Sequence, residues 1–113
     1  MIYLACPYWH DDPEVRQKRF ELVTELAGIL EARCQRVFSP ITHSHLIERE
    51  SGVRRDHDYW MPMDLRILAI CDSLQVLVLD GWRESVGIEA EIDFASQLHI
   101  PIDYIDPADY DLS

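Results

Sequence analysis

Residues 74–105 read LQVLVLDGWRESVGIEAEIDFASQLHIPIDYI, and this stretch predicts the fold. The nearly continuous apolar run at 74–80 is typical of a strand at the centre of a parallel sheet. Residues 85–99 repeat their apolar side chains with a helical period, and residues 100–105 have the pattern of another strand. A strand, a helix and a second strand in this order predict a right-handed crossover between parallel strands.

Glu91 lies at an unexpected position on the predicted helix 85–99. At 100° per residue it falls inside the broad apolar arc, between Ala95 and Leu98, whereas Glu89 and Asp93 fall on the opposite side. A buried carboxylate without a partner is costly. Glu91 therefore needs either a hydrogen-bond donor or a position in a cleft where its pKa is raised.

The rest of the chain continues the alternation of strands and helices. IYLAC at 2–6 and RVFSP at 36–40 predict short strands, and Asp12 followed by Pro13 predicts the start of a helix that runs to about residue 33. A second helix is expected from about 62 to 72, and residues 42–60 are expected to form a long loop, or a short helix with loops, of the kind that often acts as a lid. Residues 1–113 thus predict one α/β domain, a flavodoxin-like or Rossmann-like three-layer sandwich with a mainly parallel sheet of four or five strands.

Composition limits the possible functions. The chain has 113 residues, a formal net charge of −11 and a single lysine, so a nucleic-acid polymer is not an expected partner. No apolar run reaches the length of a membrane span, and the first residues lack the pattern of a signal peptide. Three widely spaced cysteines, without a C-x-x-C motif, suggest reduced thiols. We therefore expect a cytoplasmic protein that does not bind a membrane.

A parallel α/β sheet gathers its functional residues at the carboxyl edge of its strands. In this chain that edge is expected to collect residues 7–12, 39–45, Asp64 and 81–91. Asp64 also borders an apolar helical face, although an acid near a helix start is stabilised by the helix dipole alone. Two carboxylates that meet at one edge suit glycosyl chemistry, in which one attacks the anomeric carbon and the other assists the leaving group or holds the sugar.

Three segments together resemble the nucleoside 2-deoxyribosyltransferase family and its relatives, the nucleotide N-hydrolases. The segments are IYLACPYWHDD, MDLRILAICDSLQVLVLDGW and ESVGIEAEIDFA. The element order is similar through most of the chain, and the informative motifs cover about a third of it. Glu89 stands where the family has a glycine, and CPYWHDD replaces the glycine-rich first loop of the hydrolases.

The resemblance implies a role for each matching position. Tyr3 would donate a hydrogen bond to Glu91, which would attack C1′ of the sugar and release the base. Asp64 would hold a sugar hydroxyl or protonate the base. Gly87 would let the substrate approach the helix start, whose free amides suit an anion such as a 5′-phosphate. Ser85 would contact the substrate or only cap its helix. The implied activity is retaining cleavage or transfer of the N-glycosidic bond of nucleosides or nucleoside 5′-monophosphates.

Several side chains with less specific signals are candidates for the substrate pocket or for packing. Tyr8 and Trp82 could stack on a base, although aromatic side chains near strand ends more often serve packing. His43 and His45 form an H-x-H pair that is expected to line the pocket.

Two other functions stay open at this point. The H-x-H pair could belong to a metal-dependent hydrolase, although it lacks a closed zinc spacing, and we expect no metal site. A non-catalytic nucleotide-binding module would have the same fold. The four glycines form neither a G-x-G-x-x-G motif nor a P-loop, so no cofactor is expected. The expected partners are a small nucleoside or nucleotide and further copies of the chain in a homo-oligomer.

Overall fold

The computed structural model describes residues 1–112 and contains one four-stranded sheet. The strands are β1 (Ile2–Ala5), β2 (Val37–Phe38), β3 (Ser73–Leu77) and β4 (Ile102–Ile105), in the order β2-β1-β3-β4. All three strand pairs are parallel, with Leu4 opposite Gln75 and Val76 opposite Tyr104. β3 lies inside the sheet, as its apolar sequence predicts.

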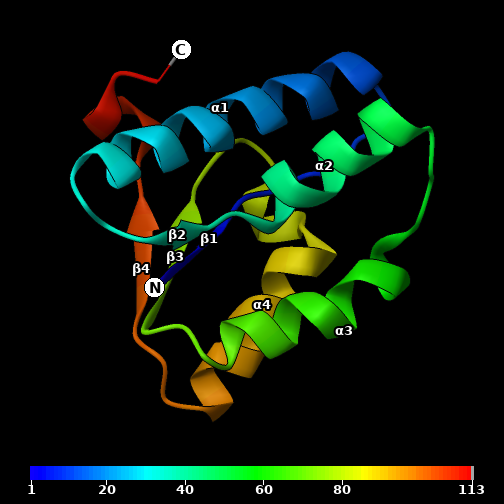
Figure 1. The fold of residues 1–113 in the computed structure, drawn as a ribbon. Helices are drawn as coiled ribbons and strands as arrows, with labels where there is room; N and C mark the ends of the chain where they lie inside the picture. The colour runs from blue at the N-terminus through cyan, green and yellow to red at the C-terminus, as the bar shows by residue number, and fades with distance from the viewer. Residues whose placement is uncertain (113) are drawn as a thin grey trace.

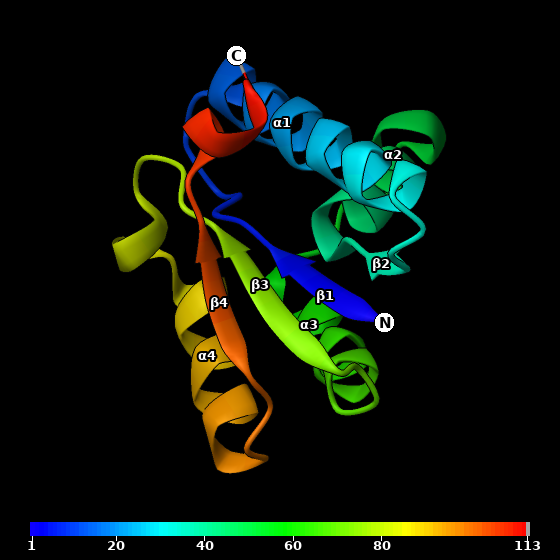
Figure 2. The same ribbon diagram turned by 90° about the vertical axis from the view of Figure 1, so that its left-hand side faces the viewer.

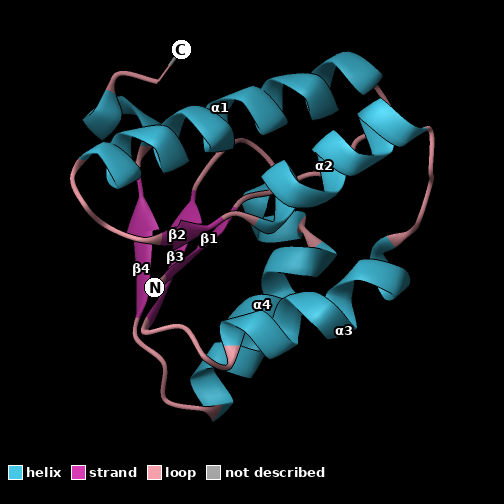
Figure 3. Cartoon of the chain, in the orientation of Figure 1, coloured by secondary structure: helices cyan, strands magenta, loops and turns pink. Residues whose placement is uncertain are grey.

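Helices cover both faces of the sheet. Figure 1 shows α1 (Pro13–Ala32) and α2 (Pro40–Ser51) on one side, and α3 (His57–Leu68) and α4 (Val86–Gln97) on the other. The quarter-turned view in Figure 2 shows β1, β3 and β4 side by side between these two helical layers. Two short 3₁₀ helices follow β3 and β4, at Trp82–Glu84 and Pro107–Tyr110 (Figure 3). The single α/β domain with a three-layer, all-parallel arrangement confirms the predicted fold class.

The alternation of side chains along each strand creates two separate cores. Tyr3 and Ala5 of β1 face α3 and α4, and pack in a cluster with Leu68 and Ile88. Leu4 faces the opposite way, into a cluster with α1. The α1 cluster contains Val23, Leu26 and Leu30, which are spaced at helical intervals. Position on the strand thus decides that Tyr3 points toward α4, the helix that carries Glu91.

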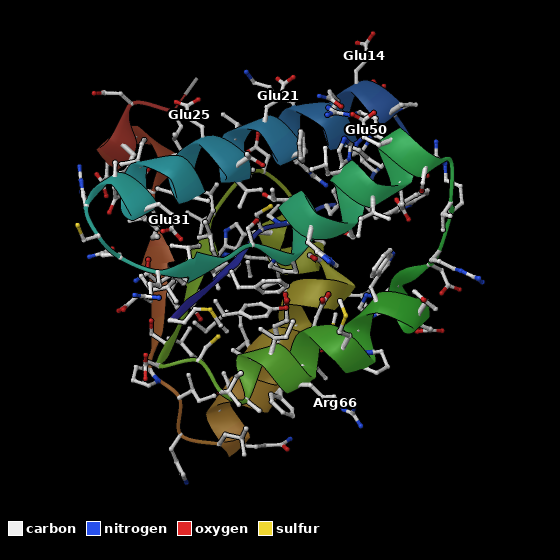
Figure 4. All side chains as sticks on the ribbon, in the orientation of Figure 1. Glu14, Glu21, Glu25, Glu31, Glu50 and Arg66 are labelled. Atoms are coloured by element: carbon white, nitrogen blue, oxygen red, sulfur yellow. The ribbon has the colours of Figure 1, made fainter. Side chains whose placement is uncertain are left out.

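The predicted helix around Glu91 is confirmed, and its start is fixed locally. Ser85 is the N-cap of α4, and its hydroxyl accepts a hydrogen bond from the backbone N–H of Ile88 at 3.2 Å. Asp12 caps α1 in the same way, with Pro13 at the first helical position. The exposed Glu14, Glu21 and Glu25 lie along the outer side of α1 (Figure 4).

Three predicted boundaries are wrong. The helix expected at 62–72 is α3, which begins at His57. Asp56 caps it by accepting a hydrogen bond from the N–H of Tyr59, and Pro62 therefore lies inside the helix. α3 ends at Leu68, and a turn leads into β3. The strand expected at 36–40 keeps only two residues, because Ser39 caps α2 and Pro40 begins it. Of the two alternatives expected for 42–60, the structure has the helix with loops: α2 ends at Ser51, and a connection at 52–56 leads into α3.

Three cysteines are free thiols, of which Cys6 and Cys71 are buried. Within the described part of the chain, no helix has the length and apolar character needed to cross a membrane.

Candidate active site

A large cavity opens at the carboxyl edge of the sheet and has a volume of about 1390 Å³. It lies among the loop after β1, the first turns of α1, helix α2, the start of α3 and the start of α4. The predicted edge residues that line it are Pro7, Tyr8, Trp9, His10, Pro40, Ile41, Ser44, His45, Asp64, Gly81, Glu84, Ser85, Val86, Gly87 and Glu91. The topology therefore brings together four segments that are far apart in sequence.

Glu91 forms part of the wall of this cavity while its side chain is almost fully buried, with 5% of the residue exposed. Tyr3, which is completely buried on β1, donates a hydrogen bond from its hydroxyl to Oε2 of Glu91. Burial raises the pKa of Glu91 to about 8, the Tyr3 hydrogen bond opposes this rise, and the charge of Asp64 adds to it. The buried acid thus has the donor that its position requires.

Asp64 is the second buried carboxyl group of the cavity wall, with 7% of the residue exposed. No group among residues 1–112 donates a hydrogen bond to its carboxyl, and burial raises its pKa to about 7. The charge of Asp64 contributes to the raised pKa of Glu91, which places the two carboxyl groups within electrostatic reach. Two neighbouring acids with pKa values near neutrality can hold one proton between them at pH 7–8.

Tyr8 and His45 form a second polar group in the cavity wall. The Tyr8 hydroxyl lies 2.6 Å from His45 Nδ1, and His45 Nε2 lies 3.0 Å from Oε1 of Gln17. Phe20 stacks on the imidazole with 4.1 Å between ring centroids. Burial lowers the pKa of His45, so its neutral form can accept from Tyr8 while it donates to Gln17. This chain of contacts fixes the orientation of the Tyr8 hydroxyl toward the cavity.

Ser85 and Gly87 both line the cavity at the start of α4. The Ser85 hydroxyl is used as the helix cap described above. Gly87 packs against α3, since an added Cβ would lie 3.7 Å from the ring of His57 and 3.8 Å from Cε of Met61. Both contacts are ordinary van der Waals distances, so α3 already covers one side of this helix start.

His43 and Trp82 lie outside the set of described residues that line the cavity. His43 is exposed on α2, and its ring meets Trp60 edge-on at 6.0 Å. Trp82 packs on Tyr104 of β4, with 5.4 Å between ring centroids. Helix α2 places His43 and His45 in different environments, because residues two apart on a helix point in different directions. Within residues 1–112, no three His, Cys, Asp or Glu side chains form a group that could hold a metal ion.

The sequence reasoning missed several residues of the cavity wall. Gln17 lines it, as do five arginines: Arg16, Arg19, Arg49, Arg54 and Arg55. The sequence does contain a pattern that could have indicated these arginines: six of the ten basic residues fall within the two short stretches 16–19 and 49–55. Only the packing of α1 beside α2 shows that these stretches face one cavity.

The model of a family described as "Domain of unknown function (DUF1937)" matches residues 1–105, which is nearly the whole chain. No curated protein matches the chain.

Proposed function

The chain belongs to the DUF1937 family, and we propose that it is an enzyme that cleaves or transfers the N-glycosidic bond of nucleosides or nucleotides. The single observation that carries this proposal is the hydrogen bond from Tyr3 to the buried Glu91, in a cavity that Asp64 also lines. The resemblance to the nucleoside 2-deoxyribosyltransferases and nucleotide N-hydrolases supports the same activity, because it implies these roles for these three residues.

The reaction begins with the ionised carboxylate of Glu91. One of its oxygens attacks C1′ of the sugar, and the bond between C1′ and the base nitrogen breaks as the new C–O bond forms. The electron pair of the broken bond goes to the base, which takes a proton from Asp64. Water or a second base then attacks C1′ as the bond between C1′ and Glu91 breaks, and the ionised Asp64 takes the proton that the attacking group loses. Two displacements thus give retention at C1′.

The two carboxyl groups can divide these roles because both titrate near neutral pH. The active form needs Glu91 ionised and Asp64 protonated, which is one of the two arrangements of a single shared proton. Tyr3 works toward this arrangement, because its hydroxyl stabilises negative charge on Glu91. Burial still leaves the pKa of Glu91, about 8, above that of Asp64, about 7, so the active form is the less populated of the two arrangements. Asp64 has no donor among residues 1–112 to stabilise its charge, and its burial favours the neutral form.

The test is a screen of nucleosides and nucleoside 5′-monophosphates for release of the free base, followed by chromatography. A 2-fluoro sugar analogue slows the second displacement, so the covalent intermediate should accumulate and be found on Glu91 by mass spectrometry. Base release with the adduct on Glu91 is the expected result. Binding of these compounds without any turnover would instead indicate a binding module, and an adduct on Asp64 would contradict the assigned roles.

A further inference from the structure

The cavity concentrates positive charge in an acidic protein. The chain has 21 acidic and 10 basic residues, yet five arginines line this one cavity. None of these five forms an ion pair with a carboxylate of residues 1–112, where the only ion pair joins the N-terminal amine to Asp72. Unpaired guanidinium groups gathered at one site are available for an anion from outside.

Two of the five arginines hold the loop after β1 in place. Arg19 donates to the backbone carbonyls of Trp9 at 2.9 Å and Asp80 at 2.7 Å, and so joins the loops that follow β1 and β3. Arg16 donates to the carbonyls of His10 and Asp11, and its guanidinium lies 4.7 Å from the ring centroid of Trp9. These contacts leave the positive charge of both side chains in the cavity wall and tie their guanidinium groups to the loop.

The other three arginines keep most of their donors free. The guanidinium groups of Arg49 and Arg55 have no acceptor among residues 1–112. They rest on aromatic rings, that of Arg49 at 5.5 Å from Phe20 and that of Arg55 at 4.9 Å from Tyr59. Arg54 uses only Nη1, which donates to the carbonyls of Glu48 at 3.0 Å and Val53 at 3.5 Å. Stacking on a ring orients a guanidinium and leaves its in-plane N–H groups open to a ligand.

Glu48 fixes the segment that carries Arg54 and Arg55. Its carboxylate accepts from the backbone N–H of Arg55 at 3.1 Å and from the indole of Trp60 at 3.4 Å. Its backbone carbonyl accepts from the N–H of Gly52 at 3.0 Å as well as from Arg54. The connection between α2 and α3 is therefore held at both ends, and the two adjacent arginines are positioned before any ligand arrives.

Arginines of α1, of α2 and of the connection between α2 and α3 all lie close enough to the His45 side chain to change its pKa. The pKa of His45 is lowered by burial first and then by the charge of Arg49; Glu48 opposes this, and Arg16 and Arg54 add smaller lowering effects. Arg16 and Arg54 also act on Tyr8, the partner of His45. Three arginines from three separate segments thus lie within electrostatic reach of one half-buried imidazole, beside the carboxylate of Glu48.

We propose that Arg49, Arg54 and Arg55 form an anion subsite that holds a phosphate group of the substrate. This inference rests on the proposed function and deepens it: the substrate is a phosphorylated nucleoside, with its sugar at Glu91 and its phosphate on the α2 side of the cavity. The volume of about 1390 Å³ exceeds the roughly 300–1,000 Å³ of usual small-ligand pockets, which leaves room for more than a base and a sugar. Arginine forks match the geometry of phosphate oxygens in a bidentate manner.

The experiment compares two double variants that each remove two exposed, ring-stacked arginines. R49Q/R55Q removes the two guanidinium groups that have no hydrogen-bond acceptor in the described structure. R33Q/R83Q is the matched control, since Arg33 and Arg83 each lie 5.2 Å from an aromatic ring, Tyr110 and Trp82, outside the cavity lining. Binding of inorganic phosphate, ribose 5-phosphate and ribose is measured by calorimetry at low ionic strength.

The expected result is binding of phosphate and ribose 5-phosphate by the wild type, weakened at least about tenfold in R49Q/R55Q and within about twofold of wild type in R33Q/R83Q. Added salt should weaken this binding. Titration of the wild type with phosphate, followed through the arginine Nε–H signals by NMR, should move Arg49 and Arg55 and leave Arg33 and Arg83 in place. This measurement does not depend on the folding of any variant.

Equal phosphate binding by R49Q/R55Q and wild type overturns the subsite, and so does the absence of phosphate binding by the wild type. The subsite is also overturned if the base is released from a nucleoside as fast as from its 5′-monophosphate and both rates are unchanged in R49Q/R55Q. The proposed function stands in that case. Phosphate binding that R49Q/R55Q weakens supports the subsite even when no base is released, in which case the proposed function alone fails.

Discussion

The hydroxyl of Tyr3 on β1 donates a hydrogen bond to Oε2 of Glu91 on α4, joining residues 88 positions apart in the chain. The first strand and the last helix of the cavity thereby share one polar contact inside an otherwise apolar cluster. The single donor stabilises the charge of the buried carboxylate. The second oxygen of the carboxylate is not held by that donor and remains able to react.

Replacing Glu91 by glutamine tests the assigned nucleophile. Glu91→Gln keeps the size of the side chain and an oxygen for Tyr3, but removes the charge that attacks C1′. Turnover should fall by about 10³-fold or more while substrate binding stays within a few-fold, because only the transition-state interaction is lost. The control is Glu89→Gln, which lies on the exposed side of the same helix and should leave turnover within about threefold of wild type. Full activity in Glu91→Gln would end this mechanism.

Tyr3→Phe removes only the hydroxyl that faces Glu91. The Tyr3 hydrogen bond lowers the pKa of Glu91, so its loss should raise that pKa and move the acidic limb of the rate profile to higher pH. The variant should therefore lose more activity at pH 7 than at pH 9, and unfolding should become easier by about 1–3 kcal/mol through the unsatisfied carboxyl. Tyr104→Phe, on the exposed edge strand β4, is the control and should shift neither quantity. A profile unchanged in Tyr3→Phe would show that Tyr3 serves packing alone.

The pH dependence of kcat/KM should be bell-shaped, with its maximum between pH 7 and 8. Catalysis needs the singly protonated pair, which is most populated between the pKa values of about 7 for Asp64 and about 8 for Glu91. In Asp64→Asn, the residual activity should lose the alkaline limb, because the group whose proton is lost there is gone. An alkaline limb that persists in Asp64→Asn would leave Asp64 the role of holding a sugar hydroxyl.

Conformational stability should fall as the pH rises from about 5 to about 8. Both acids have raised pKa values in the folded protein, so between their unfolded and folded values the native state binds more protons than the unfolded state. The stabilisation is fully present below the unfolded values and is lost as the pH passes the folded ones. Urea unfolding at several pH values should show this slope in the wild type and a smaller one in Glu91→Gln. Equal slopes in the two proteins would contradict the raised pKa of Glu91.

Activity should survive removal of divalent metals. His43 and His45 are held apart by α2, and His45 is already engaged by Tyr8 and Gln17. Base release is therefore expected to be unchanged after treatment with a chelator and gel filtration, and elemental analysis should find no stoichiometric metal. Zinc or manganese at one ion per chain, with activity lost on chelation, would favour a metal-dependent hydrolase.

The sequence alone determined the order of the elements and the direction of Glu91. These features are local: the helical period of 86–97, the cap at Ser85 and the strand patterns depend on neighbours within a few residues. The position of Asp64 beside an apolar face was visible for the same reason. The boundary of α3 was not, because a proline suggested a helix start at 62 and the cap at Asp56 prevailed.

The tertiary structure decided which side chains meet. Tyr3 faces α4 because the alternation along β1 and the register with β3 place it on that side of the sheet. The winding of α2 places His45 in the cavity wall and leaves His43 exposed. Trp82 packs on Tyr104 of the edge strand β4 and does not line the cavity. The arginines of 16–19 and 49–55 come together only when α1 packs beside α2. The pKa values of Glu91 and Asp64 also belong to this level, because burial sets them and no local pattern measures burial.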